Sequence, residues 1–193
     1  MRCETFAPLA GYPHGLTLRD PTDDTRSANF PAQIAQAYGF TGFAMAEQVH
    51  GAGVAIVNQP GLVAGVDALI TRQRGLSLLI RCADCAPVFL IDRATPAIAL
   101  IHSGKQGTLA NIVGATVQAL QPRDGLALIG PCIGPCHYEM DLWAGIEAQL
   151  RAAGITAIYN SHSCTACQLD RYYSYRVERG QTGRMFAWLA LPA

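Results

Sequence analysis

Residues 76–104 read LSLLIRCADCAPVFLIDRATPAIALIHSG, which is three apolar runs separated by two short breaks. The runs are Leu76–Arg81, Val88–Ile91 and Ala97–His102, and each has the length and composition of a β-strand. The breaks contain Asp and Pro, which interrupt strands and favour turns. The stretch therefore predicts three consecutive strands with loops between them.

The same pattern continues on both sides of this stretch. Further strand-like runs are Phe43–Val49, Val54–Val57, Ala68–Thr71, Leu126–Ile129, Tyr172–Val177 and Met185–Leu191. Helix-forming composition or helical periodicity marks Pro31–Tyr38, Thr108–Leu120 and Asp141–Ala153. Residues 1–29 are rich in Pro, Gly, Thr and Asp, and predict loops around at most a short strand near Leu16–Leu18. We therefore predict one α/β (α+β) domain over residues 1–193, with a mixed β-sheet flanked by helices and a short, loop-rich segment at about residues 1–40.

The composition excludes several classes of protein. Of the 193 residues, 50% are hydrophobic and 15% are charged, which rules out a disordered chain. The net charge is zero and no Lys/Arg cluster is present, so we expect no nucleic-acid partner. The apolar runs fall far below the roughly 18–20 residues of a membrane span, and Met1–Glu4 lacks the layout of a signal peptide. We therefore expect no membrane association, a cytoplasmic location and, for the seven cysteines, thiolate chemistry or metal binding instead of disulfides.

Three residues that can bind metals stand at the ends of predicted strands. His50 follows one strand, Cys85 lies in the break before Val88, and His102 ends the third run. Loops at strand ends hold side chains at fixed separations, so we expect these three residues to converge. Two imidazoles and one thiolate suit zinc, which keeps a fourth position for water or substrate at catalytic sites. The alternative is that the histidines are hydrogen-bonded structural residues and that Cys85 is a small apolar one.

Other cysteines form less specific patterns. The pairs Cys82/Cys85 and Cys164/Cys167 have the spacing of zinc knuckles, but they are 79 residues apart, against roughly 15–20 in a zinc ribbon. The first pair leads into a strand and not into a helix, which disfavours a redox role. Two more candidate metal sets, each with a turn as its alternative, are Cys132, Cys136 and His137, and Cys164 and Cys167 with His162.

Three segments together resemble a known family. Residues 47–51 read EQVHG, residues 83–88 read ADCAPV and residues 101–104 read IHSG. Their order and spacing are similar to those of the multicopper polyphenol oxidase or laccase-domain family, also called the YfiH-like family of purine nucleoside phosphorylases. Other segments that resemble its landmarks are Asp67–Thr71, Ile129–Gly134, Tyr138–Glu139, Tyr173–Arg176 and Thr182–Arg184. The resemblance covers about Phe43 to Leu191 and implies a YfiH-like fold.

The resemblance implies a zinc enzyme. In such a protein His50, Cys85 and His102 would be the catalytic residues and would hold one zinc ion beside the substrate. The implied reactions are phosphorolysis of purine nucleosides (adenosine, inosine, guanosine and methylthioadenosine) and hydrolytic deamination of adenosine, with a nucleoside and phosphate as partners. Some members resemble peptidoglycan editing factors, which are amidases, and that activity stays an alternative.

Further residues are predicted to bind the substrate. Where members of the family usually read HAGWRG, residues 102–107 read HSGKQG, so the expected Trp and Arg are absent. Lys105, the only lysine of the chain, is predicted to supply the charge of that Arg toward phosphate, with a solvated surface lysine as the alternative. Gln48 and Arg176, which lie in matching segments, are the other predicted substrate-binding residues.

One acidic residue is predicted to support the metal ligands. Asp84 is adjacent to Cys85, and a carboxylate in this tight loop could orient His50 or His102 through the ring nitrogen that does not bind metal. The alternative is that Asp84 caps the backbone of its own loop.

Three other functions compete with the zinc enzyme. A true laccase is excluded because a multicopper cluster needs many more imidazoles than the five histidines of the chain, so copper is less expected than zinc. Without a metal, Cys85 would be the nucleophile of a cysteine hydrolase, with His50 or His102 as its base. A non-catalytic metal-binding module is disfavoured by glycines at positions 51, 53, 104 and 107, which suit close approach of a ligand. The zinc enzyme is the preferred hypothesis.

Overall fold

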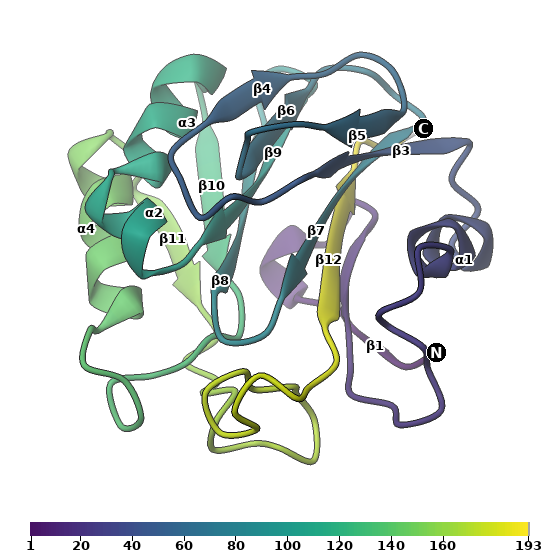
Figure 1. Cartoon of the computed structure of the whole chain (residues 1–193). Helices are drawn as coiled ribbons and strands as arrows, with labels where there is room; N and C mark the ends of the chain where they lie inside the picture. The colour runs from purple at the N-terminus through teal and green to yellow at the C-terminus, as the bar shows by residue number, and fades with distance from the viewer. Residues whose placement is uncertain (193) are drawn as a thin grey trace.

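The computed structural model describes residues 1–192, whose strands form two mixed six-stranded sheets that pack against each other (Figure 1). The first sheet has the order β1 (Cys3–Glu4), β2 (His14–Thr17), β12 (Met185–Ala190), β7 (Leu76–Cys82), β3 (Gly42–Ala46) and β5 (Gly61–Val63). The second has the order β11 (Ala157–Asn160), β10 (Gly125–Ile129), β8 (Ala86–Asp92), β9 (Ala97–Ser103), β6 (Ala68–Thr71) and β4 (Val54–Ile56). The predicted mixed α/β class is confirmed, although the strands form two sheets and not one.

Helices cover the outer faces of the sheets. α1 (Phe30–Ala37) packs on the first sheet, whereas α2 (Lys105–Leu109), α3 (Ile112–Leu120) and α4 (Leu142–Ala152) gather beside the second (Figure 1). A short 3-10 helix, η1, spans Ala7–Leu9. Among residues 1–192, no helix is long and apolar enough to cross a membrane. The layers therefore follow the order helix, sheet, sheet, helix.

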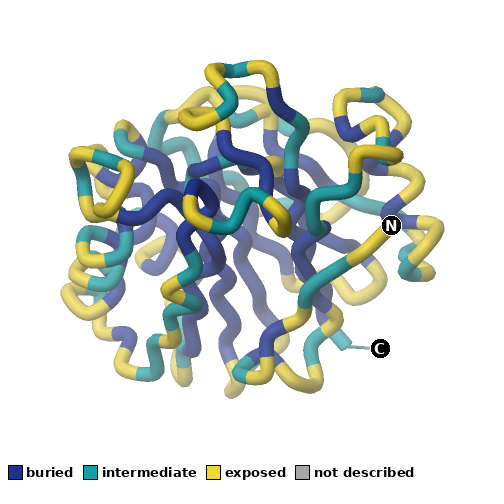
Figure 2. Tube along the Cα trace, turned by 90° about the horizontal axis from the view of Figure 1, so that it is seen from below, coloured by how far each residue is buried: buried dark blue, intermediate teal, exposed yellow. Residues whose placement is uncertain are grey.

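The central strands bury both of their faces. On β8, Phe89 and Ile91 enter the core between the sheets, while Val88 and Leu90 pack toward α3 and α4. On β7, Leu79 packs toward α1. Because apolar partners lie on both sides, these strands are continuous apolar runs and do not alternate with polar residues. Figure 2 shows the buried strands at the centre of the molecule with exposed loops around them.

The connection between β7 and β8 explains why a single sheet was the wrong expectation. β7 pairs with β12 and β3, whereas β8 pairs with β9 and β10. Residues 83–85 therefore cross from one sheet to the other. A break between two apolar runs indicates a connection, but it does not tell whether the flanking strands pair with each other. The crossing brings Cys85 to a point where both sheets end.

Several element boundaries also differ from the sequence pattern. The run Tyr172–Val177 is not a strand: Tyr172 and Tyr173 bury their rings in the core between the sheets without pairing with a strand, and a turn begins at Tyr175. The helix predicted over Thr108–Leu120 begins earlier, at Lys105, and is interrupted at Asn111, whose φ of 59° is left-handed. The strands β1, β5 and β11, which were not predicted, are short and lie at sheet edges, where few neighbours impose a pattern.

Candidate metal centre

The ends of both sheets bring together His50, Cys85 and His102, which we call the strand-end cluster. His50 lies in the loop after β3, Cys85 in the crossing between the sheets, and His102 near the end of β9. Ala86 of β8 pairs with Ser103 of β9, and this register places Cys85 beside the end of β9. One donor atom of each residue lies within 4.8 Å of the others, and the two imidazole centroids are 5.0 Å apart. The structure thus places the three predicted ligands around one point.

Asp67, a residue outside the predicted set, holds two members of the strand-end cluster in place. It is fully buried directly before β6, and its Oδ1 accepts the Nδ1–H of His102 at 2.8 Å. The carboxylate also accepts the backbone N–H groups of Val49, His50 and Gly51, at 3.1, 3.0 and 2.8 Å. The bond to Nδ1 leaves Nε2 of His102 free to bind a cation. The signals in the sequence are a lone carboxylate before a mainly apolar strand and the place of Asp67 in a segment that resembles the family.

The ionisation states of the cluster favour cation binding. Burial lowers the pKa of His102 below its usual value, although the carboxylate of Asp67 acts in the opposite direction. Burial acts to raise the pKa of Asp67, but hydrogen bonds from His102 and Gly51 outweigh it and hold that pKa below its usual value. His102 is therefore neutral near neutral pH, which is the form that binds metals. Burial, together with the charges of Asp84 and Asp67, raises the pKa of the Cys85 thiol to about 12, and a bound cation would reverse this effect.

The loops around the cluster are held in strained or tightly packed conformations. The φ angles of Gln48, His50 and Asp84 are 67°, 61° and 86°, in the left-handed region that residues other than glycine rarely adopt. Gly104 approaches the cluster closely, because a β-carbon at this position would lie 2.6 Å from Sγ of Cys85. Backbone strain of this kind is concentrated at functional sites, where the surrounding structure stabilises it.

Asp84 does not take the orienting role that was predicted for it. Its Oδ1 accepts the hydroxyl of Thr165 at 2.7 Å, and its Oδ2 accepts the backbone N–H of Arg176 at 2.7 Å. Among residues 1–192, neither imidazole of the cluster is a hydrogen-bond partner of this carboxylate. Asp67 orients His102 instead, because the pairing of β6 with β9 brings the two residues together. The carboxylate nearest in sequence was therefore the wrong choice.

A cavity of ≈ 810 Å³ opens over the strand-end cluster. Its lining includes all three members of the cluster and the aromatic side chains of Tyr138 and Tyr175. The cationic residues that line it are Arg81, Lys105, Arg176, Arg179 and Arg184. Against these five cations stands a single acidic lining residue, Asp84. The cavity therefore suits a ligand with an anionic part and a flat, apolar part.

Three of these arginines were not predicted to belong to the site. Among residues 1–192, no carboxylate lies within ion-pair distance of Arg81, Arg179 or Arg184. Burial, and to a smaller extent repulsion by the nearby Arg184, lowers the pKa of Arg81. Gln48, which was predicted to bind substrate, exchanges two hydrogen bonds with the backbone of Arg81, at 2.6 and 2.7 Å. The Gln48 amide is therefore occupied in holding its own loop at the cavity wall.

The other two predicted substrate-binding residues meet at Glu139. Nζ of Lys105 lies 2.9 Å from Oε1 of Glu139, and Nη2 of Arg176 lies 3.6 Å from Oε2 of the same residue. The guanidinium of Arg176 also lies over the ring of Tyr138, 4.8 Å from its centroid. All of these ion-pairing side chains are about half exposed, so an anion that enters the cavity can compete with Glu139 for both cations.

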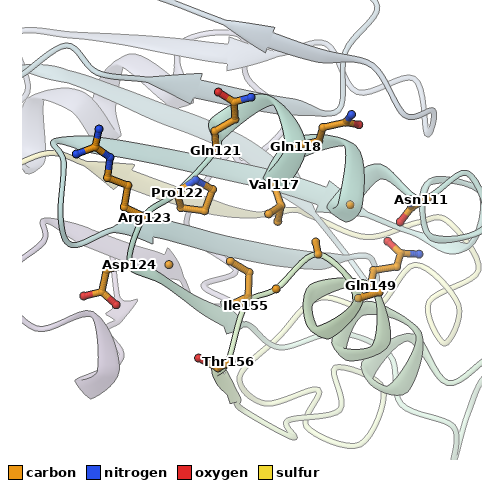
Figure 3. Close-up of a pocket in the computed structure, with 15 residues that line it drawn as sticks. Asn111, Val117, Gln118, Gln121, Pro122, Arg123, Asp124, Gln149, Ile155 and Thr156 are labelled. Carbon is orange, nitrogen blue, oxygen red and sulfur yellow. The ribbon is translucent and has the colours of Figure 1, made fainter.

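A second cavity, of ≈ 580 Å³, lies between α3, α4 and the start of β10 (Figure 3). Its polar lining includes Gln118, Gln121, Arg123, Asp124 and Gln149. Among the residues that the structure describes, no histidine or cysteine lines it, and its one arginine is balanced by one aspartate. The cavity over the strand-end cluster is therefore the candidate functional site.

The structure gathers a second group of metal-binding side chains, which we call the loop cluster: Cys136, His137, Cys164 and Cys167. Its members come from both of the additional candidate metal sets, one around Cys136 and the other around Cys164, which are far apart in the sequence. Cys132 and His162 were parts of those sets but lie outside the group. Cys82, which was paired with Cys85 as a possible zinc knuckle, is buried in the core between the sheets and belongs to neither cluster.

Comparison with known proteins agrees with this arrangement. The family model described as "Multi-copper polyphenol oxidoreductase laccase" matches residues 8–141 and 137–192. The protein named "Purine nucleoside phosphorylase YlmD" from Geobacillus stearothermophilus is 30% identical, over 96% of this chain and 85% of its own length. A "Purine nucleoside phosphorylase" from Deinococcus radiodurans is 35% identical, over 95% of this chain and 85% of its own.

Solved structures show the same fold. The crystal structure of YlmD from Geobacillus stearothermophilus superposes with a TM-score of 0.88 at 29% identity, covering 97% of this chain and 94% of that one. The hypothetical protein YfiH from Bacillus licheniformis superposes with a TM-score of 0.86 at 22% identity, over 95% of this chain and 94% of its own. The chain therefore belongs to the laccase-like family of multi-copper polyphenol oxidoreductases that includes the YfiH and YlmD proteins.

Proposed function

We propose that this chain is a zinc-dependent purine nucleoside phosphorylase that acts on adenosine, inosine, guanosine and methylthioadenosine, with deamination of adenosine as a second activity. The observation that carries the proposal is the presence, in one cavity, of the strand-end cluster and five cationic side chains. The relatives named purine nucleoside phosphorylases support it. All seven cysteines are free thiols, which suits the reducing cytoplasm that the proposal includes.

The donor set fits a catalytic zinc ion. Two imidazoles and one thiolate are ligands that zinc accepts, and three protein ligands leave a fourth position, which here faces the cavity. Copper fits less well despite the name of the family, since His14 is bonded to the backbone of Phe6 and Tyr12 and too few imidazoles remain for a multicopper centre. When bound, zinc would supply Lewis acidity toward a phosphate oxygen, a ribose oxygen or a water molecule.

The residues of the chain account for the remaining requirements of phosphorolysis. In this reaction an oxygen of phosphate forms a bond to C1′ of the ribose, the bond from C1′ to the purine breaks, and the products are the free base and ribose 1-phosphate. Lys105, Arg176 and Arg184 would attract and orient the phosphate. The rings of Tyr138 and Tyr175 would offer apolar faces to the purine.

One observation favours a second candidate, a metal-free cysteine hydrolase. Asp67, His102 and Cys85 supply a carboxylate, an imidazole and a thiol in the order that such enzymes use, with Cys85 as the nucleophile. The third convergent donor, His50, has no part in a triad of this kind, and this favours the zinc enzyme. An amidase that edits a peptidoglycan precursor could use either arrangement.

The proposal is tested by incubating the purified chain with adenosine, with and without phosphate, and measuring adenine, inosine and hypoxanthine. Adenine that forms only with phosphate reports phosphorolysis, and inosine that forms without phosphate reports deamination. We expect both activities to be lost on chelation, to return with zinc and to be absent from His50→Ala. The matched control is His162→Ala, which removes a histidine outside both clusters and should keep activity.

The other outcomes identify the competing functions. Activity that survives chelation but is lost both on thiol alkylation and in Cys85→Ala would show that Cys85 acts as a nucleophile. Turnover of a peptidoglycan precursor, without product from any purine nucleoside, would show the amidase. One equivalent of metal at the strand-end cluster with no turnover of either substrate class would leave a metal-binding module.

A further inference from the structure

The loop cluster lies outside the cavity and has no part in the proposed reaction. Cys136 and His137 belong to the loop between β10 and α4, and Cys164 and Cys167 to the loop after β11. One donor atom from each of the four lies within 4.8 Å of the others. Cys164 is buried and the other three are exposed. Four soft or borderline donors from two loops that are distant in sequence thus surround one point.

The distances within the loop cluster match a metal-sized tetrahedron. Sγ of Cys136 lies 3.6 Å from Sγ of Cys164 and 3.5 Å from Sγ of Cys167. Nδ1 of His137 lies 3.3, 3.9 and 3.5 Å from the sulfurs of Cys136, Cys164 and Cys167. Around a tetrahedral zinc ion, bond lengths of about 2.3 Å to sulfur and 2.0–2.1 Å to nitrogen place two sulfurs about 3.8 Å apart and a sulfur and a nitrogen about 3.6 Å apart.

The backbone holds these donors independently of any ligand. Cys132 and Cys164 form an isolated parallel β-bridge between the two loops. In this bridge the N–H of Cys132 donates to the carbonyl oxygen of Ser163, and the N–H of Thr165 donates to the carbonyl oxygen of Cys132. The backbone N–H of Gly134 donates to Sγ of Cys164 at 3.3 Å. A hydrogen bond from a backbone amide to sulfur stabilises the thiolate that a metal requires. Cys132 therefore positions the loop cluster through its backbone, although it is not one of the donors.

We propose that the loop cluster binds one zinc ion in a closed, structural site made of three thiolates and one imidazole. Four protein ligands that do not line a cavity are typical of structural zinc, whereas catalytic zinc keeps a position open. A disulfide would join only two of the three sulfurs and would leave His137 without a role. The proposed site is separate from the strand-end cluster, and it does not depend on the function proposed for that cluster.

The zinc ion would join two loops that form one wall of the cavity. Tyr138, which lines the cavity, directly follows His137. Thr165 lies between the two cysteines of the second loop and donates to Asp84, which also accepts the backbone N–H of Arg176. Occupation of the loop cluster therefore fixes the positions of Tyr138 and Arg176 relative to each other. We expect its loss to raise the KM for substrate without removing metal from the strand-end cluster.

Metal content of the purified full chain is the first test. We expect two zinc equivalents in the wild type, one in the double variant Cys136→Ser/Cys167→Ser, and one in His102→Ala. Cys3→Ser is the matched control, because it removes a cysteine outside both clusters and should keep two equivalents. His137→Cys should also keep two, since it converts the site to a set of four thiolates, which zinc accepts equally well. A double variant with as much metal as the wild type would overturn the proposal.

A second test leaves the loop cluster intact. Cys85→Ala removes the only thiol of the strand-end cluster, so a thiolate-to-cobalt charge-transfer band in this variant loaded with Co²⁺ must come from the loop cluster. We expect that band, and we expect seven reactive thiols in the denatured, chelated wild type. Absence of the band, or two thiols fewer because of a disulfide, would overturn the proposal. Failure of the proposed function would appear separately, as a wild-type chain that holds both metal equivalents and releases no base from any purine nucleoside in the presence of phosphate.

Discussion

The strand-end cluster and the loop cluster contain the same kinds of side chain, cysteine and histidine, but the parts of the fold that hold them differ. The first takes its three donors from the ends of two packed sheets, faces a cavity and is supported by the buried carboxylate of Asp67. The second takes four donors from two loops, with three of them exposed, and draws its support from the backbone bridge of Cys132 and Cys164. Residue types alone therefore do not distinguish a catalytic metal site from a structural one. The number of protein donors and their access to a cavity do.

The largest effect should come from removing a ligand of the strand-end cluster. His50→Ala, Cys85→Ala and His102→Ala should each lose one metal equivalent and keep the metal of the loop cluster. Because a catalytic metal contributes several kcal/mol of transition-state stabilisation, turnover should fall by about 1000-fold or more. Metal analysis beside a phosphorolysis assay checks both parts. If all three variants kept full metal content, the assignment of these ligands would be wrong.

Asp67→Asn should give the next largest effect. The substitution keeps the size of the side chain but removes the charge that fixes the Nδ1–H of His102 and three backbone N–H groups. Loss of such a supporting carboxylate typically lowers metal affinity or activity by about 10–100-fold. Competition with a chelator measures the affinity, and the metal of the loop cluster should not change.

Asp84→Asn is the matched control for that prediction. Asp84 is also a buried carboxylate beside the cluster, but it binds Thr165 and the backbone of Arg176 and neither imidazole. Its replacement should change the KM for substrate more than the affinity for metal. Equal losses of metal affinity in the two variants would mean that general charge, and not the bond to His102, supports the strand-end cluster.

These two aspartates show where the sequence stops being informative. His50, Cys85 and His102 could be predicted to converge because each borders an apolar run, and strand ends meet at sheet edges. Asp67 could not be chosen over Asp84, because its contact with His102 depends on the pairing of β6 with β9. Pairing is a long-range property that a local pattern does not contain.

The same limit applies to the second sheet and to the loop cluster. The apolar runs of β7 and β8 were recognised as strands, but their assignment to different sheets depends on their partners. The half-sets around Cys136 and Cys164 were visible as separate candidates. They are joined by the bridge between Cys132 and Cys164 and by the hydrogen bond from Gly134 to Sγ of Cys164, which the sequence does not indicate. Three cations of the cavity wall, Arg176, Arg179 and Arg184, come from the segment between β11 and β12, and no periodicity indicates that this segment meets the strand-end cluster.

Lys105→Ala tests a residue that belongs to the cavity but to neither cluster. Its Nζ is 2.9 Å from Glu139, and phosphate would have to replace this carboxylate. Loss of one charged hydrogen bond to phosphate should raise the KM for phosphate by about tenfold while metal content and any phosphate-independent deamination stay unchanged. Equal loss of both activities would indicate a structural role for Lys105, and no loss would show that it does not contact phosphate.

Glu139 gives the smallest expected effect, and it is the residue that connects the two regions. It follows His137 of the loop cluster by two positions, and it pairs with Lys105 and Arg176 at the cavity. The hydrogen bond from Lys105 holds the pKa of Glu139 below its usual value, so Glu139 is ionised near neutral pH and competes with phosphate for both cations. Protonation relieves this competition only when the pH falls through that lowered pKa.

Glu139→Gln removes the competing charge at every pH while keeping the shape of the side chain. Because exposed ion pairs are weak, the KM for phosphate should fall by only about two- to threefold near neutral pH, and the melting temperature should hardly change. The difference between variant and wild type should shrink in acid, where Glu139 of the wild type is protonated. Metal content should stay at the wild-type value for both clusters. A rise in the KM for phosphate would show the opposite role, in which Glu139 holds Lys105 and Arg176 ready for the anion and so transmits the order of the loop cluster to the cavity.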